Sequence, residues 1–394
     1  MRFVVLLAGV TLAAQQKPVD FQREIRPILS DACYQCHGPD KGSRMANLRL
    51  DVLGPAIVPG KPEESKLWRR VNHANAAMRM PPPQAHKDLT DGQKESLRKW
   101  IEQGATYKEH WSFSAPMRPA APVVKNLNWA RNPIDRFLLA RMEAEGLTPA
   151  PEADRRTLAR RVSLDLTGLP PSPAEVEAFV KDSAADAYER LVDRFMAKPQ
   201  YGEHRGRFWL DAARYADTHG LHVDNYREMW PYRDWVIGAF NKNMPFDQFT
   251  LEQLAGDLLP NPTMEQRIAT GFHRCNITTN EGGSIEDEVA AIYAKDRVDT
   301  TGAVWMGLTV GCATCHDHKF DPITQREFYQ MAAFFRNTTQ KPLDGNIHDT
   351  PPVITVPAEN ERARWHALLI EEKARRERRE AHRGAARGGV EKWV

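Results

Sequence analysis

Two short stretches of the chain combine cysteine and histidine at a spacing that can hold an iron porphyrin. They are Cys33-Tyr-Gln-Cys36-His37 and Cys312-Ala-Thr-Cys315-His316. Two thiols three residues apart lie on one side of a helical turn, where each can form a thioether with one vinyl group of haem. The histidine that follows can give its imidazole to the iron as the proximal ligand. The pattern therefore predicts two covalently attached haem c groups.

Disulfides and zinc are the alternative uses of these cysteines. An oxidising compartment permits disulfides, but a disulfide does not require a histidine directly after each pair. A zinc site shared by both pairs is disfavoured because most of the chain separates them, whereas zinc-binding pairs lie close together in sequence. The fifth cysteine, Cys275, belongs to no such motif and is expected to be a small buried apolar side chain.

The first haem needs a second axial ligand some tens of residues beyond His37. Met80 is favoured because Pro81-Pro82-Pro83 follows it, and a stiff proline run presents a side chain at low entropic cost. Ligation by methionine and histidine leaves no open position on the iron, which suits electron transfer rather than oxygen chemistry. The other candidates, of which the first is the nearest rival, are Met78, His73 and His86.

The second motif is crowded by further polar residues, Asp317, His318 and Asp321. Either carboxylate can orient an imidazole through its free N–H, and His318 can shuttle protons to a substrate at an open iron, so these three are the candidate catalytic residues. The alternative is a helix-capping aspartate and a surface histidine. Spacing does not identify the distal ligand of this haem, for which the candidates are His219, His222 and His273, followed by Met306.

Composition bounds the fold and the partners. The chain has 394 residues, 41% of them hydrophobic, which is enough for more than one compact domain. A net charge of +2 gives no electrostatic support for nucleic-acid binding. No apolar run approaches the roughly 20 residues that a membrane span needs.

The first residues, Met1 to Ala14, read as a short secretory signal peptide, which predicts a periplasmic or otherwise exported protein. A buried N-terminal strand is the alternative.

Hydrophobic periodicity predicts a mainly α fold. A small cytochrome c-like helical domain is expected over residues 17–107, after a signal peptide at 1–16. Its closing helix begins at the capping box Thr90-Asp-Gly-Gln93. A proline- and alanine-rich linker is expected over 108–128.

A larger all-helical domain that carries the second motif is expected over residues 129–340. Asn132-Pro133 and Ser172-Pro173 each place a capping residue before a proline, as at helix starts. Residues 341–394 read as a linker and a charged helical segment, either half of a coiled coil or the beginning of a part of the protein that the chain lacks.

At these residues the chain resembles a known family. Val19-Asp-Phe21, Cys33-Tyr-Gln-Cys-His-Gly-Pro39 and Met80-Pro-Pro82 are similar to the planctomycete-type cytochrome c domain. Three longer strings are similar to the domain of unknown function that usually follows it: Trp209-Leu-Asp-Ala-Ala-Arg-Tyr-Ala-Asp217, Glu252-Gln-Leu-Ala-Gly-Asp-Leu-Leu-Pro260 and Cys315-His-Asp-His-Lys-Phe-Asp-Pro322. The resemblance covers residues 19–340 and implies an exported haem protein, suited to electron transfer or oxidoreductase work, with a further C-terminal domain that is missing here.

Three classes of function follow. The favoured one is a periplasmic di-haem protein that transfers electrons, as part of an oxidoreductase system, to or from a redox partner protein or a small molecule. The second is a haem enzyme, peroxidase-like or dehydrogenase-like, with an open second iron. The third is a non-redox enzyme or binding module, related to polysaccharides, in which haem is structural or regulatory.

Overall fold

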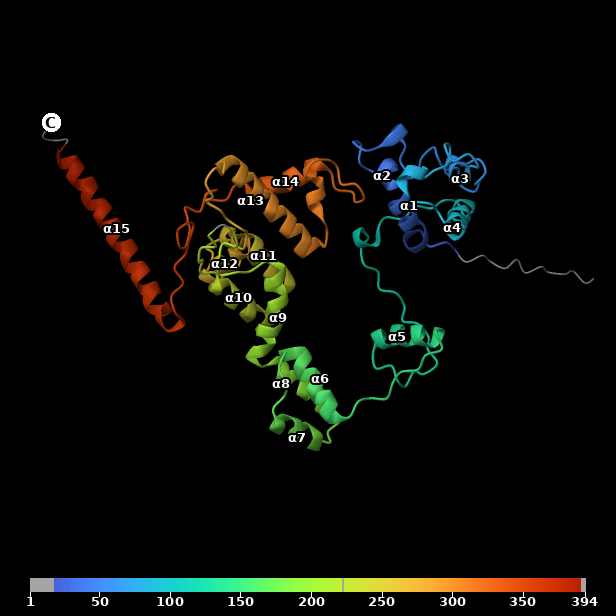
Figure 1. The fold of residues 1–394 in the computed structure, drawn as a ribbon. Helices are drawn as coiled ribbons and strands as arrows, with labels where there is room; N and C mark the ends of the chain where they lie inside the picture. The colour runs from blue at the N-terminus through green and yellow to red at the C-terminus, as the bar shows by residue number, and fades with distance from the viewer. Residues whose placement is uncertain (1–17, 222, 391–394) are drawn as a thin grey trace, which may run out of the picture. The chain divides into compact units, whose positions relative to one another are not determined.

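The computed structural model describes residues 18–221 and 223–390 (Figure 1). The prediction of a mainly α fold is confirmed, because the structure is 55% helical with almost no strand. Within the described residues, β structure is limited to two isolated bridges, Thr218 with Tyr226 and Thr279 with Leu343. The predicted signal peptide and His222 lie outside the described residues.

The chain divides into two compact units. The first comprises residues 1–152 and 301–335, and the second comprises residues 153–300 and 336–394. The segment that carries the second Cys-x-x-Cys-His motif therefore belongs to the same unit as the first motif. These units cut across the helical domain expected over 129–340, so the domain boundaries given above stay a prediction.

The helices of the first unit's N-terminal part enclose a core of their own. They are η1 (Phe21–Ile25), α1 (Arg26–Ala32), α2 (Tyr34–His37), α3 (Lys66–Val71) and α4 (Asp91–Glu102). Phe21, Ile25 and Leu29 recur at helical spacing and are each at most 3% exposed. They pack with Leu97 and Trp100 of α4. This core positions the first haem motif between the entering and the closing helix.

The predicted start of α4 is confirmed in detail. The Thr90 side chain accepts a hydrogen bond from the Gln93 N–H, and the Gln93 side chain accepts one from the Thr90 N–H. The same reciprocal cap, from Asn132 and Asp135, opens α5 (Pro133–Ala144). The first unit also contains η2 (Met45–Asn47), η3 (Pro83–Ala85), η4 (Trp111–Phe113), η7 (Gly302–Met306), η8 (Val310–Thr314) and α14 (Gln325–Phe335).

The second unit is helical around two clusters. Apolar side chains of α6 (Arg155–Thr167), α7 (Pro173–Lys181) and α8 (Ala187–Met196) form one core. The other gathers aromatic rings around Phe249, which contacts Trp209 and Trp235 at centroid distances of 4.7 and 5.3 Å. The remaining helices of the second unit are α9 (Pro199–Ala212), α10 (Trp230–Asn241), α11 (Phe246–Ala255), η5 (Gly256–Leu258), α12 (Met264–Ala269), η6 (Thr270–Arg274), α13 (Glu286–Thr301), η9 (Glu359–Glu361) and α15 (Arg362–Val390).

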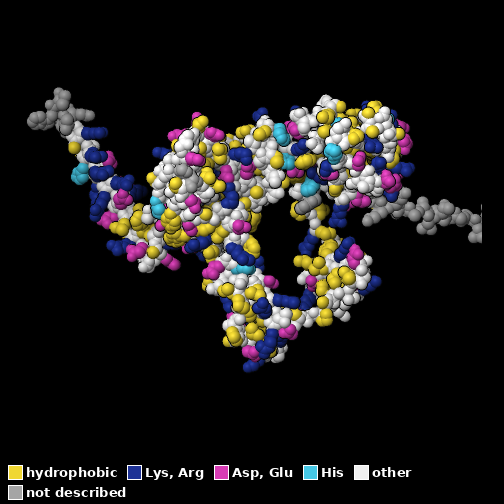
Figure 2. All heavy atoms as spheres, in the orientation of Figure 1, with side chains coloured by type: hydrophobic (Ala, Val, Ile, Leu, Met, Phe, Trp, Pro, Cys, Tyr) yellow, Lys and Arg dark blue, Asp and Glu magenta, His cyan; other side chains and the backbone are white. Residues whose placement is uncertain are grey.

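The surface mixes charges of both signs. On the face drawn in Figure 2, Lys and Arg side chains are interspersed with Asp and Glu, in keeping with the small net charge. Within the described residues no helix has the length and apolar character needed to cross a bilayer.

Candidate haem-binding site

The first motif lies on one helical turn, as its spacing predicts. Cys33 is the residue before α2, and its carbonyl oxygen accepts hydrogen bonds from the N–H groups of Cys36 at 3.1 Å and His37 at 2.9 Å. Both cysteines are free thiols. The turn therefore presents two thiols and an imidazole in the order that covalent haem attachment requires.

The protonation of these groups fits haem better than zinc. Burial, followed by the nearby Asp31 and Cys36, raises the pKa of the Cys33 thiol to about 12, and a protonated thiol is a poor metal ligand. Burial lowers the pKa of His37, which keeps its imidazole neutral, as an iron ligand must be. Its Nδ1 atom is buried without a hydrogen-bond partner among the described residues. The residues present thus fit a covalently bound haem c.

The four candidates for the second ligand of the first haem, His73, Met78, Met80 and His86, all lie between α3 and α4. The guanidinium of Arg70 donates a hydrogen bond to the carbonyl oxygen of Met78 at 3.0 Å and lies 3.7 Å from its sulfur. The Met80 N–H is bonded to the Arg70 carbonyl oxygen at 3.0 Å. His73 contacts its own loop at Asn75. Met78 is thereby engaged with Arg70, so Met80 stays the predicted ligand.

The second motif is more open than the first. Cys312 lies in η8 and Cys315 follows it, and both are exposed. His316 is half exposed, and its Nδ1 lies 2.7 Å from the carbonyl oxygen of Asp317. Because a carbonyl can only accept, Nδ1 is the donor in this hydrogen bond, and Nε2 is the nitrogen left available to a metal. This site also fits a haem, with His316 as the proximal ligand.

Each of the three candidate catalytic residues forms a hydrogen bond or ion pair with residues close to it in the sequence. Asp317 accepts a hydrogen bond from the Gln325 N–H at 3.0 Å and so caps α14. His318 is 4% exposed, and its Nδ1 accepts from the N–H groups of Phe320 at 3.2 Å and Asp321 at 2.8 Å. That nitrogen is therefore unprotonated, although a carboxylate oxygen of Asp321 lies 3.7 Å away. Their catalytic role stays a prediction.

The two motifs meet within the first unit. Nδ1 of His316 lies 3.8 Å from a carboxylate oxygen of Asp40, three residues after His37. Asp321 forms an ion pair with Arg26 of α1 at 3.8 Å. A Cβ on Gly38 would lie 3.1 Å from the Lys319 carbonyl oxygen, so the two backbones approach closely there. No spacing rule in the sequence indicates this contact.

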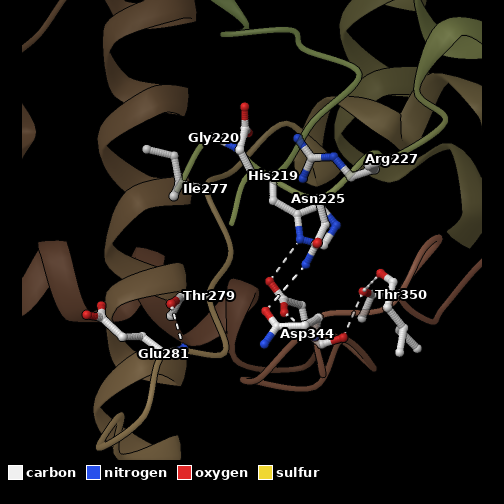
Figure 3. A network of polar contacts seen from close by, with 12 residues as sticks. His219, Gly220, Asn225, Arg227, Ile277, Thr279, Glu281, Asp344 and Thr350 are labelled. Atoms are coloured by element: carbon white, nitrogen blue, oxygen red, sulfur yellow. Dashed lines mark hydrogen bonds and ion pairs between the residues drawn. The ribbon is translucent and has the colours of Figure 1, made fainter. Parts of the chain in front are cut away.

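The candidate distal ligands of the second haem fall in different units. His219 is buried in the second unit, with Nδ1 2.9 Å from a carboxylate oxygen of Asp344 (Figure 3). His273, in the same unit, contacts the Leu254 carbonyl oxygen at 3.2 Å, and burial lowers its pKa to about 4. Met306 lies in η7 of the first unit and is 55% exposed. The distal ligand stays a prediction.

Two family models match the chain. The model described as Planctomycete cytochrome C matches residues 33–84, and the model described as Protein of unknown function (DUF1549) matches residues 133–340, more than half of the chain. The chain belongs to the DUF1549 family and carries a planctomycete cytochrome c domain before that region. Their order is the one predicted from the sequence. Neither the curated proteins nor the solved structures contain a match.

The match to the planctomycete cytochrome model identifies the kind of cofactor that this protein binds. The planctomycete cytochrome is a c-type cytochrome that binds covalent haem c, and the matched range includes Cys33, Cys36, His37 and Met80. The second motif lies inside the range matched by the other model. Sequence reasoning missed Asp40 and Arg26, because their partners lie far away along the chain.

Proposed function

We propose that this planctomycete cytochrome is an exported di-haem protein that passes single electrons between its two haems and a redox partner, within an oxidoreductase system. The observation that supports this most directly is the contact of His316, in the second motif, with Asp40, three residues after the first motif, within one compact unit. Electron tunnelling through protein weakens steeply with distance, so neighbouring haems exchange electrons without a mobile carrier.

Each haem would supply an iron that accepts and releases one electron. The chain's own residues would set the environment of each iron. Cys33 and His37 sit beside a buried apolar core, and Met80 is the predicted second ligand, a combination that raises a reduction potential. Cys312, Cys315 and His316 are more exposed.

Asp40 adds a negative charge beside His316. Burial alone would raise the pKa of this carboxyl, but hydrogen bonds from Ser43 and Gly42, together with the nearby His316, lower it. The carboxylate is thus ionised at neutral pH, and negative charge near an iron favours its oxidised form. We therefore expect the second site to have the lower potential and to pass electrons to the first.

A spectroscopic redox titration of the full-length holoprotein tests this proposal. Two one-electron waves are expected, and replacing Cys312 and Cys315 by Ala should remove the lower one. The matched variant, with Cys33 and Cys36 replaced by Ala, should remove the higher one. A single wave in the wild-type protein, or two waves that both survive the Cys312 and Cys315 replacements, would overturn the proposal.

Carbon monoxide separates electron transfer from haem catalysis. Two irons that each carry two axial protein ligands leave no site for the gas, so the reduced spectrum should not change. A rapid shift of half the haem absorbance would instead indicate an open iron and support the haem enzyme. Export is tested separately, because mature protein from the periplasm of a bacterial host should begin near residue 15.

A further inference from the structure

A short hairpin in the second unit buries two polar side chains on one face. The His219 N–H donates to the Asn225 carbonyl oxygen at 3.0 Å, and the Arg227 N–H donates to that of Asp217 at 2.9 Å. Alternation along paired strands places His219 and Arg227 on the same face, and Tyr226 on the other. His219 is 2% exposed and Arg227 is 5% exposed, whereas Tyr226 is 46% exposed.

Two further arginines lie against the same buried segment. Asn276 accepts from Arg227 through its carbonyl oxygen at 2.9 Å and from Arg297 through its side-chain oxygen at 3.3 Å. Arg274 donates to the Thr350 carbonyl oxygen at 2.7 Å. All these acceptors are neutral, and across residues 18–221 and 223–390 none of the three guanidinium groups forms an ion pair with a carboxylate.

The carboxylate of Asp344, which lies beside His219, already accepts hydrogen bonds. Oδ2 of Asp344 lies 2.9 Å from Nδ1 of His219, and its Oδ1 accepts from the Asn346 N–H at 2.9 Å (Figure 3). Among the described residues, Nε of Arg227, Nη1 of Arg274 and Nε2 of His219 are buried and have no hydrogen-bond partner. Asp217, Asp224 and Asp344 attract the Arg227 guanidinium, but within the described residues none of them forms an ion pair with it. Buried charges are normally paired directly, so Arg227 and Arg274 lack a directly bonded negative group.

The pKa shifts of the three arginines agree with the lack of a directly bonded negative group. Burial, reinforced by repulsion from Arg227 and Arg297, lowers the pKa of Arg274 to about 10. Burial likewise lowers the pKa of Arg227 and of Arg297. A guanidinium whose charged form is disfavoured in this way gains the most from an incoming anion.

We propose that Arg227, Arg274 and His219 form a binding site for an oxyanion, namely the carboxylate, sulfate or phosphate group of a small-molecule ligand. Guanidinium groups present planar forks of donors that match such oxygens. Nδ1 of His219 faces Asp344, which leaves Nε2 as the ring nitrogen available to a bound group. Arg274 is only partly buried, so one edge of this site reaches the surface.

A metal ion does not fit the same place. Arginine offers donors and no lone pair, and three positive charges repel a cation. Within the described residues no group of three or more His, Cys, Asp or Glu side chains is arranged to hold a metal. The residues of this site belong to the second unit, whereas both haem motifs belong to the first.

The test compares the melting temperature of full-length holoprotein with that of Arg227→Met. Sodium sulfate, phosphate and acetate are each added against sodium chloride at matched ionic strength. Sulfate stabilises most proteins by exclusion, so the readout is the difference between wild type and variant. We expect several degrees more stabilisation of the wild type by at least one oxyanion. Without oxyanion, Arg227→Met should melt at or above the wild type, because a buried unpaired charge is gone.

The matched control is Arg214→Met, in the same unit. Arg214 is partly exposed and already forms a two-point ion pair with Asp296 at 2.5 and 2.9 Å, so this variant should respond to oxyanions as the wild type does. Equal gains for wild type and Arg227→Met with all three anions would overturn the proposal. If Arg227→Met does not fold, Arg274→Gln replaces it, and calorimetric titration of the wild type must show saturable binding of an oxyanion or the proposal fails.

Discussion

His316 lies beside Asp40, with its Nδ1 3.8 Å from a carboxylate oxygen, although the two residues belong to opposite ends of the matched sequence. Asp40 follows the first haem motif and His316 completes the second. Their contact lies within one compact unit, alongside the ion pair between Arg26 and Asp321. Two motifs that look independent in the sequence therefore form one region of the folded protein.

Replacing Met80 should change the first haem alone. In Met80→Ala we expect the first iron to lose its second protein ligand, which converts a low-spin spectrum to a high-spin one and lowers that haem's potential. Met78→Ala is the matched control, because the Met78 sulfur lies 3.7 Å from Arg70. Absorption spectra measure the spin state of each variant, and the redox titration measures its haem potentials. A spectral change in Met78→Ala with none in Met80→Ala would transfer the assignment to Met78.

Asp40 should contribute stability that depends on pH. Hydrogen bonds to a buried carboxylate contribute about 1.5–3 kcal/mol, so Asp40→Asn should lower the free energy of unfolding at neutral pH by up to about that amount. The folded pKa of Asp40 is lowered, so this contribution is full above the ordinary aspartate pKa and declines as pH falls through the folded value.

Chemical denaturation of wild type and Asp40→Asn at several pH values measures this difference. The gap between the two proteins should be largest near neutral pH and should narrow as the pH falls below the ordinary aspartate pKa. A gap that is constant over the whole range would show that the charge of Asp40 contributes nothing.

Gly38 should not tolerate a side chain. A Cβ there would lie 2.5 Å from the Tyr34 carbonyl oxygen and 3.1 Å from that of Lys319, so backbone on both sides has to move. We expect Gly38→Ala to cost about 1–3 kcal/mol. The control is Gly92→Ala near the start of α4, where the nearest atom would be 3.9 Å away and alanine favours the helix. Similar melting temperatures for both variants would contradict the close approach of the two motifs.

The helix that closes the first haem region should depend on its cap. Thr90→Ala removes the hydrogen bond to the Gln93 N–H and should destabilise the protein by about 1 kcal/mol. Thr90→Ser keeps the hydroxyl and should retain most of the stability. Thermal unfolding of the holoprotein compares them, and an equal loss in both variants would show that the cap does not matter.

Local features of the fold were readable from the sequence. The caps at Thr90, Asn132 and Ser172 follow from residue types within four positions, and the structure has all three. The first haem motif lies on a helical turn for the same reason. The second departs from that expectation, since it spans a 3₁₀ turn and the residues after it.

Contacts between segments that lie far apart in the sequence could not be predicted from the sequence. Arg227 and Arg297 are buried at 5% and 4% exposure, and no pattern in the sequence around them indicates this burial. His219 was a candidate axial ligand, but nothing in its sequence neighbourhood indicates Asp344 as its partner. Such pairings depend on how helices pack, which spacing along a chain does not encode.

The most direct test of two haems in one chain is the intact mass of the holoprotein, produced with a haem-attachment system and measured after denaturation. We expect the mass of the mature polypeptide plus two haem groups. We expect one haem group when Cys312 and Cys315 are both replaced by Ala, and one when Cys33 and Cys36 are both replaced. A wild-type mass that corresponds to the bare polypeptide, or to a single haem, would contradict it.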